Sequence, residues 1–399
     1  MALTINTNVN SMTAQRNLGA SQNMLSTAMQ RLSSGLRLNS AKDDSAGLAI
    51  AERMNAQVRG LNVAARNAND GVSLAQTAEG ALGKVGDMLQ RMRELAVQSS
   101  NATNSADDRK ALQAEVGQLR DEIDRVAKNT GFNGQKLLDG SFAAANFQVG
   151  SNSGETITVA ALTNSSAKGL SKVVYGEGSQ VDISATAITN LAEITNGSLT
   201  VTAAGTTYTL GDLGAARTAE ERLGQVVEAV NRATADTGVT AFLKKQTDGQ
   251  FKVELLSSKL DVDGSAVAVA LAGFSTATTG LDTSISITNG NTTSAVGIDK
   301  LSVATAQDAW LAIKQIDDSL KQVNDTRATL GAVQSRFENA VSNIAIQSEN
   351  TAAARGRIVD ADFAQETANL SKAQILQQAG TAMVAQANQQ PQQVLSLLR

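Results

Sequence analysis

The sequence predicts an α+β fold, with a long coiled-coil-like helical rod formed by the N- and C-terminal segments and a mostly β module inserted in the middle. Apolar residues recur at the 3-4 spacing of a helical stripe over about residues 1–140 and 300–399. The single proline, Pro391, leaves long helices uninterrupted. Between these blocks Gly, Ser and Thr dominate, and short alternating runs replace the helical spacing.

Consecutive helices account for the N-terminal block. Turn and cap residues at Asn39–Asp44 and Ser99–Asp108 separate the helices, and a helix over about 57–100 would be on the order of 65 Å long. The apolar stripes are Leu18, Ser21, Leu25, Ala28 and Leu32, then Leu61, Ala65, Ala68, Val72 and Ala75, continued by Leu82, Val85, Leu89, Met92 and Ala96, and finally Leu112, Val116, Leu119, Ile123 and Val126.

The C-terminal block repeats the helical pattern. A second helical stretch, rich in Ala and Gln, follows from Asp360 to Arg399 and ends in VLSLLR. Heptad-like spacing is held by Ile313, Ile316, Leu320, Val323, Leu330, Val333, Phe337, Ala340 and Ile344.

The middle block, from about residue 141 to 297, predicts strands and one helix. The sequence TDGQ at 247–250 indicates a hairpin turn. Thr218 and Glu221 are spaced as a capping box, so a helix is expected to begin there. The expected strands are Glu155–Ala161, Ser198–Thr202, Thr206–Leu210, Val239–Lys245 and Phe251–Leu256.

The chain lacks the side chains that most often carry chemistry at neutral pH. With no His and no Cys, imidazole catalysis, thiolate nucleophiles and zinc sites are excluded. A net charge of -4 gives no electrostatic case for nucleic acid or anionic lipid. Residues 1–19 lack the apolar region of a secretory signal peptide, and no apolar run is long enough to span a membrane. We therefore expect no enzymatic activity, no cofactor, no metal and no membrane insertion.

Several motifs that suggest ligand sites have simpler interpretations. LDVDG at 260–264 lacks the acidic residue that closes a calcium loop, and GEG at 176–178 lacks the lysine of a phosphate loop. Trp310 is expected in a core or an interface. The Asp pairs at 43–44, 107–108 and 317–318 are adjacent in sequence, so the two carboxylates of a pair diverge on a helix, and carboxylates near helix starts simply favour the macrodipole. We therefore expect no catalytic dyad among them.

The two terminal stretches are unusual. Residues 1–41 contain no Asp or Glu, and 374–399 contain one charged side chain, Arg399. Neither stretch alone buries enough apolar surface to offset the entropy of ordering. We expect them to be mobile in a free subunit and to fold against each other and against neighbouring subunits; the alternative is ordinary amphipathic helices docked on their own domain.

Long motifs at both ends carry a family resemblance. They are ALTINTNVNSMTAQRNL at 2–18, RLSSGLRLNSAKDDSAGLAIAERM at 31–54, GLNVAARNANDGVSLAQTAEGAL at 60–82, LQRMRELAVQSSN at 89–101, GFNGQKLLDG at 131–140, FQVG at 147–150, and the whole segment 348–399. Together they resemble the bacterial flagellins over about 1–175 and 296–399. Gly356 is a departure, since the family more often has Ser there, and the middle only loosely resembles the β-rich insert of some members.

The resemblance implies a structural subunit that polymerises into the helical, extracellular filament of the bacterial flagellum, which is used for motility. It implies three domains, namely an inner domain of 1–44 plus 357–399, a helical rod domain with a β-hairpin of 45–175 plus 296–356, and a variable exposed α+β insert of 176–295. The implied partners are further copies of the chain, a flagellar export chaperone at the C-terminus, and hook-associated and cap proteins, with secretion by type III export.

Two alternatives to this function remain open. A hook–filament junction protein shares the terminal helices. An enzyme on the same scaffold would need a constellation of carboxylates and Ser or Thr in 176–295, and the sequence has none that stands out.

The resemblance also assigns two sets of contact residues. Segment 89–98 is similar to the stretch of certain flagellins recognised by the innate receptor Toll-like receptor 5. Arg91 and Leu95, four residues apart on a helix, would present a charged donor beside an apolar knob, on a face that could instead serve subunit packing. The expected receptor or subunit interface is Gln90, Arg91, Glu94, Leu95 and Glu115. The expected filament-core contacts are Leu18, Leu25, Leu32, Leu370, Leu376, Met383, Val394, Leu397 and Leu398.

Overall fold

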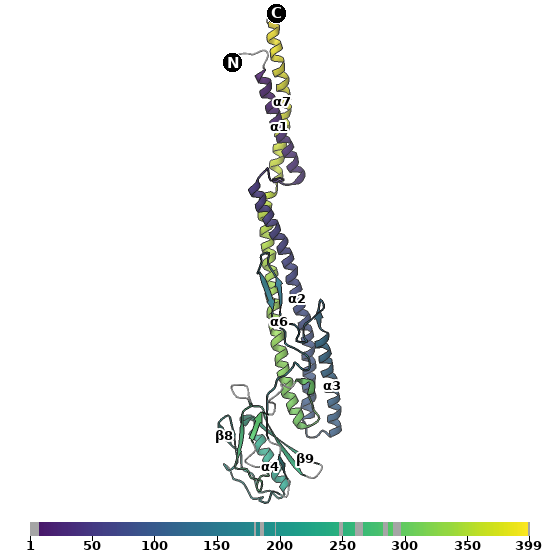
Figure 1. Ribbon diagram of the computed structural model, residues 1–399, viewed down its shortest axis with the longest axis vertical. Helices are drawn as coiled ribbons and strands as arrows, with labels where there is room; N and C mark the ends of the chain where they lie inside the picture. Colours follow the sequence, from purple (N-terminus) through teal and green to yellow (C-terminus); the bar gives the residue numbers. More distant parts are fainter. Residues whose placement is uncertain are drawn as a thin grey trace. The chain divides into compact units, whose positions relative to one another are not determined.

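The computed structural model describes residues 8–178, 181–183, 187–195, 197–246, 250–259, 266–281, 286–289 and 297–397 (Figure 1). The chain divides into two compact units. Unit 1 consists of Met1–Val72, Asn146–Thr158 and Ser335–Arg399, and unit 2 of Ser73–Ala145 and Val159–Gln334. Helices α2 (Ser45–Ser99) and α6 (Ala306–Val359) contribute to both units.

In unit 1, the first and last helices lie side by side and antiparallel (Figure 1). Helix α1 is Val9–Ser34 and helix α7 is Phe363–Leu397. Helix α1 ends at Gly35, which adopts φ 72° and closes the helix with its N–H on the Arg31 carbonyl at 2.8 Å. The Gly35 carbonyl then accepts from the Ala361 N–H at 2.9 Å, which ties the two connecting turns together.

In the rest of unit 1, an aromatic contact joins α6, α2 and a β-hairpin. Phe337 of α6 packs edge-to-face on Phe147, with ring centroids 5.4 Å apart. On α2 it meets Gly71, where an added Cβ would lie 2.6 Å from the ring, so only glycine leaves room for it. Phe147 belongs to β3 (Ala145–Gln148), which pairs with β4 (Thr156–Val159) as a hairpin.

In unit 2, three helices share a core of large aliphatic side chains. Helix α3 is Ala106–Asn129 and begins with a full capping box between Ser105 and Asp108. A two-residue hairpin of β1 (Gly131–Phe132) and β2 (Gln135–Lys136) follows it. The buried positions include Leu82, Val85, Leu89 and Met92 on α2, Val116 and Ile123 on α3, and Ile316, Val323 and Leu330 on α6.

Unit 2 also contains an antiparallel sheet in the order β6-β10-β5-β12-β11-β7-β8, with β9 paired to β10. The strands are β5 (Gly176–Gly178), β6 (Val181–Ile183), β7 (Thr200–Ala203), β8 (Thr206–Thr209), β9 (Val239–Lys245), β10 (Phe251–Ser257), β11 (Val269–Ala272) and β12 (Ser286–Asn289). Helix α4 (Ala219–Arg232) packs on β9 and closes the core, while α5 (Thr234–Thr237) and the 3-10 turn η2 (Ile298–Lys300) are short connections.

The predicted α+β class is confirmed, with long helices at both ends of the chain and strands between them. The hairpin is confirmed, since β9 pairs with β10 from Lys245↔Phe251 to Val239↔Ser257. The helix expected over about 57–100 begins earlier, at Ser45, because the Asp44 carboxylate accepts from the Gly47 N–H at 2.9 Å and starts it there.

The capping box at α4 is only half formed. Thr218 accepts from the Glu221 N–H at 3.2 Å, as expected, but the Glu221 carboxylate accepts from the Arg217 N–H instead of that of Thr218. The motif LDVDG and the turn residues 247–249 lie outside the described residues. GEG at 176–178 is strand β5.

Candidate functional site

The contact between α1 and α7 is built mainly from small side chains. The predicted stripe on α1 faces α7, with Ser21 and Ala28 buried and Leu18, Leu25 and Leu32 half-buried. On α7 the facing positions follow the same spacing, and an added Cβ at Gly380 would lie 3.1 Å from Cδ1 of Leu18. The inward positions on α7 are Glu366, Leu370, Ala373, Gln377, Gly380, Val384 and Ala387. The two helices therefore approach closely but bury few large side chains.

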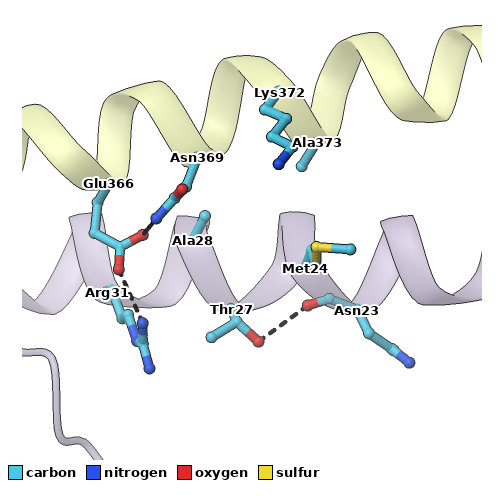
Figure 2. Close-up of a pocket in the computed structure, with 9 residues that line it drawn as sticks. All are labelled: Asn23, Met24, Thr27, Ala28, Arg31, Glu366, Asn369, Lys372 and Ala373. Carbon is cyan, nitrogen blue, oxygen red and sulfur yellow. Dashed lines mark hydrogen bonds and ion pairs between the residues drawn. The ribbon is translucent and has the colours of Figure 1, made fainter.

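One buried ion pair crosses this interface. Figure 2 shows Glu366 of α7 directed at Arg31 of α1, where Nη1 donates to Oε1 at 2.9 Å. Asn369 donates to the other carboxylate oxygen at 3.2 Å. The Glu366 side chain is 8% exposed, and the hydrogen bond from Arg31 holds the pKa of its carboxyl below the usual range, against the opposing effect of burial.

The same two helices also carry exposed apolar side chains, some of them beside the seam between the helices. Their exposed fractions run from 39% at Leu376 to 67% at Phe363. The set is Val9, Met12, Met24 and Met29 on α1, and Phe363, Ile375, Leu376 and Met383 on α7. Large apolar side chains gathered on an exposed surface are typical of protein–protein contacts.

The predicted filament-core residues divide between the helix interface and these exposed side chains. Leu18, Leu25, Leu32 and Leu370 face the partner helix. Leu376 and Met383 are more exposed, and they line a groove between the two helices, opposite Thr13 and Asn17 of α1. The side chains of Val394 and Leu397, and all of Leu398, lie outside the described residues.

The second predicted surface, in unit 2, is polar. Arg91 pairs with Glu94 at 3.0 Å and with Glu115 of α3 at 2.9 Å, and all three side chains are more than two-fifths exposed. Gln90 is exposed beside them. The expected apolar knob is wrong, because Leu95 is 1% exposed. It lies beside Met92 and Ala96 in the buried stripe of α2, so it packs into the core although it is only four residues from Arg91.

The Asp pairs have structural partners. Asp43 accepts from the backbone of Asn39 and Ser40, and these hydrogen bonds hold its pKa below the usual range. Asp317 pairs with Arg93 at 2.6 Å, and Asp318 accepts from the Lys172 N–H at 3.0 Å. Trp310 contacts Phe242 of β9 edge-on, at 6.5 Å between ring centroids, in agreement with its expected role in packing.

Comparisons with known proteins place the chain in a family. The model for the bacterial flagellin N-terminal helical region matches residues 5–143, and the model for the C-terminal helical region matches 313–398. The chain is 40% identical to B-type flagellin of Pseudomonas aeruginosa and to flagellin B of Vibrio cholerae, with 100% of each chain covered. Flagellin A of Vibrio anguillarum is 42% identical with the same coverage. The chain belongs to the bacterial flagellin family.

Solved structures align less closely with this flagellin. FliC from Burkholderia pseudomallei covers 67% of the chain at 26% identity, with 100% of its own length aligned and a TM-score of 0.39. The flagellar junction protein FlgL from Legionella pneumophila covers 78% at 15% identity, with 99% of its own length aligned and a TM-score of 0.40. These scores do not separate filament from junction proteins. The full-length sequence relatives do, and they favour the filament subunit over the hook–filament junction protein.

This flagellin is accordingly the subunit of a helical homopolymer, and flagellins form the flagellar filament, which is extracellular. The family is one of structural proteins. Among the described residues no helix is long and apolar enough to cross a membrane, and no three His, Cys, Asp or Glu side chains are grouped to hold a metal ion.

Proposed function

We propose that the exposed apolar side chains of α1 and α7 form the main surface on which subunits of this flagellin polymerise. The observation that carries the proposal is the set of exposed apolar side chains on both helices, in stretches with almost no charge. A head-to-tail contact that does not close generates a helical filament. Apolar side chains that are exposed in the single subunit are available to form such a contact with a neighbouring subunit.

The test uses purified subunit added to fragments of its own filaments. Met383→Asp and Ile375→Asp place a charge on the exposed apolar face of α7, and elongation should stop. Leu243→Asp is the matched control, because Leu243 is also apolar and 37% exposed but lies on β9. Normal elongation by both α7 variants would remove this face from the assembly contacts.

We also propose that the chain is divided into three domains. An inner domain of 1–44 plus 357–399 contains both terminal helices, a helical domain of 45–175 plus 296–356 contains the large aliphatic core, and 176–295 is an exposed insert. The non-helical turns after Ser34 and after Val359 support the inner boundary. Replacing 176–295 with a short Gly/Ser linker should still permit filaments, which microscopy of the deletion variant would establish.

Before assembly, the α7 face needs protection from aggregation. We infer that the subunit leaves the cell through type III export and that an export chaperone covers Phe363, Ile375, Leu376 and Met383 until then. An amphipathic helix laid into an apolar groove is a common recognition mode. Ile375→Asp should weaken capture by the chaperone from the same organism, while Leu243→Asp should leave capture unchanged.

The Arg91 cluster supports a second partner. We propose that Gln90, Arg91, Glu94 and Glu115 form a surface recognised on the free subunit by Toll-like receptor 5, with Leu95 holding the helix from inside the core. Arg91 is half exposed and already oriented by two carboxylates, so its guanidinium is presented to a partner with little loss of side-chain freedom.

Receptor binding by monomeric variants tests this surface. Arg91→Ala should weaken binding by about tenfold or more, as truncation at an interface hot spot does. Arg125→Ala is the control, because Arg125 is also an exposed arginine paired with a carboxylate, on α3. Equal binding by the two variants and the parent, with helix content unchanged, would exclude the cluster.

A further inference from the structure

Helix α7 lacks one of its backbone hydrogen bonds. Pro391 is the one proline of the chain, and α7 continues past it to Leu397. A proline has no backbone N–H, so the carbonyl four residues earlier, that of Ala387, cannot receive its helical bond. Interrupting a helix in this way is costly, and a carbonyl left without a partner adds to the cost.

Asn8 of α1 supplies the missing donor. Its Nδ2 donates to the Ala387 carbonyl at 2.8 Å, while its Oδ1 accepts from the Ser11 N–H at 3.1 Å and caps α1. These two partners fix the orientation of the amide, since the reverse would face donor with donor and acceptor with acceptor. Ser11, which is 6% exposed, adds a second bond across the helices, from Oγ to Oδ1 of Asn388 at 2.7 Å.

The contact between Asn8 and Ala387 matters because the packing of α1 against α7 does not by itself fix their axial register. Small side chains such as Ser21, Ala28 and Ala373 form much of the interface, and surfaces of this kind discriminate poorly between one axial register and the next. A slip of one helical turn would bring Asn8 opposite a carbonyl that already has its helical donor. Only at Ala387 does a proline leave a carbonyl in need of the Asn8 amide.

We propose that Asn8 and Pro391 form a register clamp, in which the proline frees a carbonyl and the asparagine amide binds it, so that α1 and α7 are positioned for polymerisation. The Arg31–Glu366 pair holds the other end of the same interface at 2.9 Å. The proposal rests on the assembly role proposed above for the two helices. Both residues are positioning residues, because they set how the assembling faces are presented.

A double-mutant cycle on the full-length chain tests the clamp. Asn8→Ser keeps a good capping oxygen but loses the amide arm, and Pro391→Ala restores the helical bond to Ala387. The critical concentration for seeded elongation is measured for the parent, both single variants and the double variant. Asn8→Ser should raise it by about two- to tenfold in the parent, the size expected for one hydrogen bond, and by less than about twofold in the Pro391→Ala background.

Every outcome of the cycle is decisive. The same fold-change in both backgrounds would overturn the clamp and leave Asn8 as a helix cap only. If Asn8→Ser abolishes elongation, recovery in the double variant supports the clamp, and failure to recover overturns it. Ile375→Asp, run alongside, separates the two proposals: normal elongation by that variant refutes the assembly face, whereas an additive cycle with Ile375→Asp still blocked refutes only the clamp.

Discussion

The terminal helix pair of unit 1 and the helical core of unit 2 use the same 3-4 spacing with opposite results. In unit 2 the spacing places Leu82, Leu89 and Ile123 in a core where they are wholly buried. In the terminal pair it buries Ser21, Ala28 and Ala373 and leaves Ile375 and Met383 exposed. Helical periodicity therefore sets which side chains face a neighbour, but the size of those side chains decides whether that neighbour suffices for stability.

Deletion of α7 should affect the terminal pair and the core of unit 2 very differently. Removing residues 360–399 deletes α7 and should abolish polymerisation, while the core of unit 2 stays folded because none of it lies in the deleted segment. Electron microscopy and circular dichroism of the truncated chain measure the two parts of this expectation. Filaments of normal length would contradict it, and so would the loss of most helical signal.

Leucine truncations in the two regions should differ in their effect on the monomer. Leu89→Ala removes a fully buried side chain from unit 2 and should destabilise it by about 2–5 kcal/mol. Leu25→Ala removes a half-buried side chain from the terminal pair and should change the unfolding of the monomer by less than about 1 kcal/mol, yet lower the melting temperature of the filament. Denaturant unfolding of both monomers and thermal scans of both filaments supply the values; equal monomer effects would undo the distinction.

Acid should loosen the terminal pair before the aliphatic core. The pKa of the Glu366 carboxyl is lowered in the folded pair, chiefly by the Arg31 hydrogen bond, so its contribution is present above its ordinary value of 4.5 and is lost as pH falls through the lowered value. Filament stability is to be measured from pH 7 downward. Glu366→Gln filaments should be weaker near neutrality and lose less stability on acidification; an unchanged acid profile would exclude Glu366 as the group responsible.

The fold class, the helix breaks and the longest hairpin could be predicted from the sequence because each depends on local signals. The capping box of Ser105 and the alternation in 239–256 can be read without tertiary information. Not predicted were the short strands, which are two to four residues long and are each paired with a neighbouring strand: β1, β2, β3, β5, β6, β11 and β12. Periodicity over so few residues does not distinguish a strand from a loop.

The candidate contact residues also depend on tertiary packing, which the sequence pattern does not show. Sequence spacing put Arg91 and Leu95 on one helix face, but it could not show that α2 is covered closely enough there to bury Leu95. The contact between Asn8 and Ala387 joins residues 379 positions apart in sequence. The sequence shows a proline inside a helical stretch, which indicates that one backbone carbonyl lacks its helical donor. Only the packing of α1 against α7 identifies Asn8 as the group that replaces this donor.

Amide hydrogen exchange, compared between free subunit and filament, tests most directly whether neighbours complete the terminal helices. In the monomer, amides of residues 9–34 and 363–389 should exchange within seconds, while those of α2 near Leu89 stay protected. In the filament both sets should be protected. Strong protection of the terminal helices in the free subunit would show that α1 and α7 are stable as a pair, and that they do not need neighbouring subunits in order to fold.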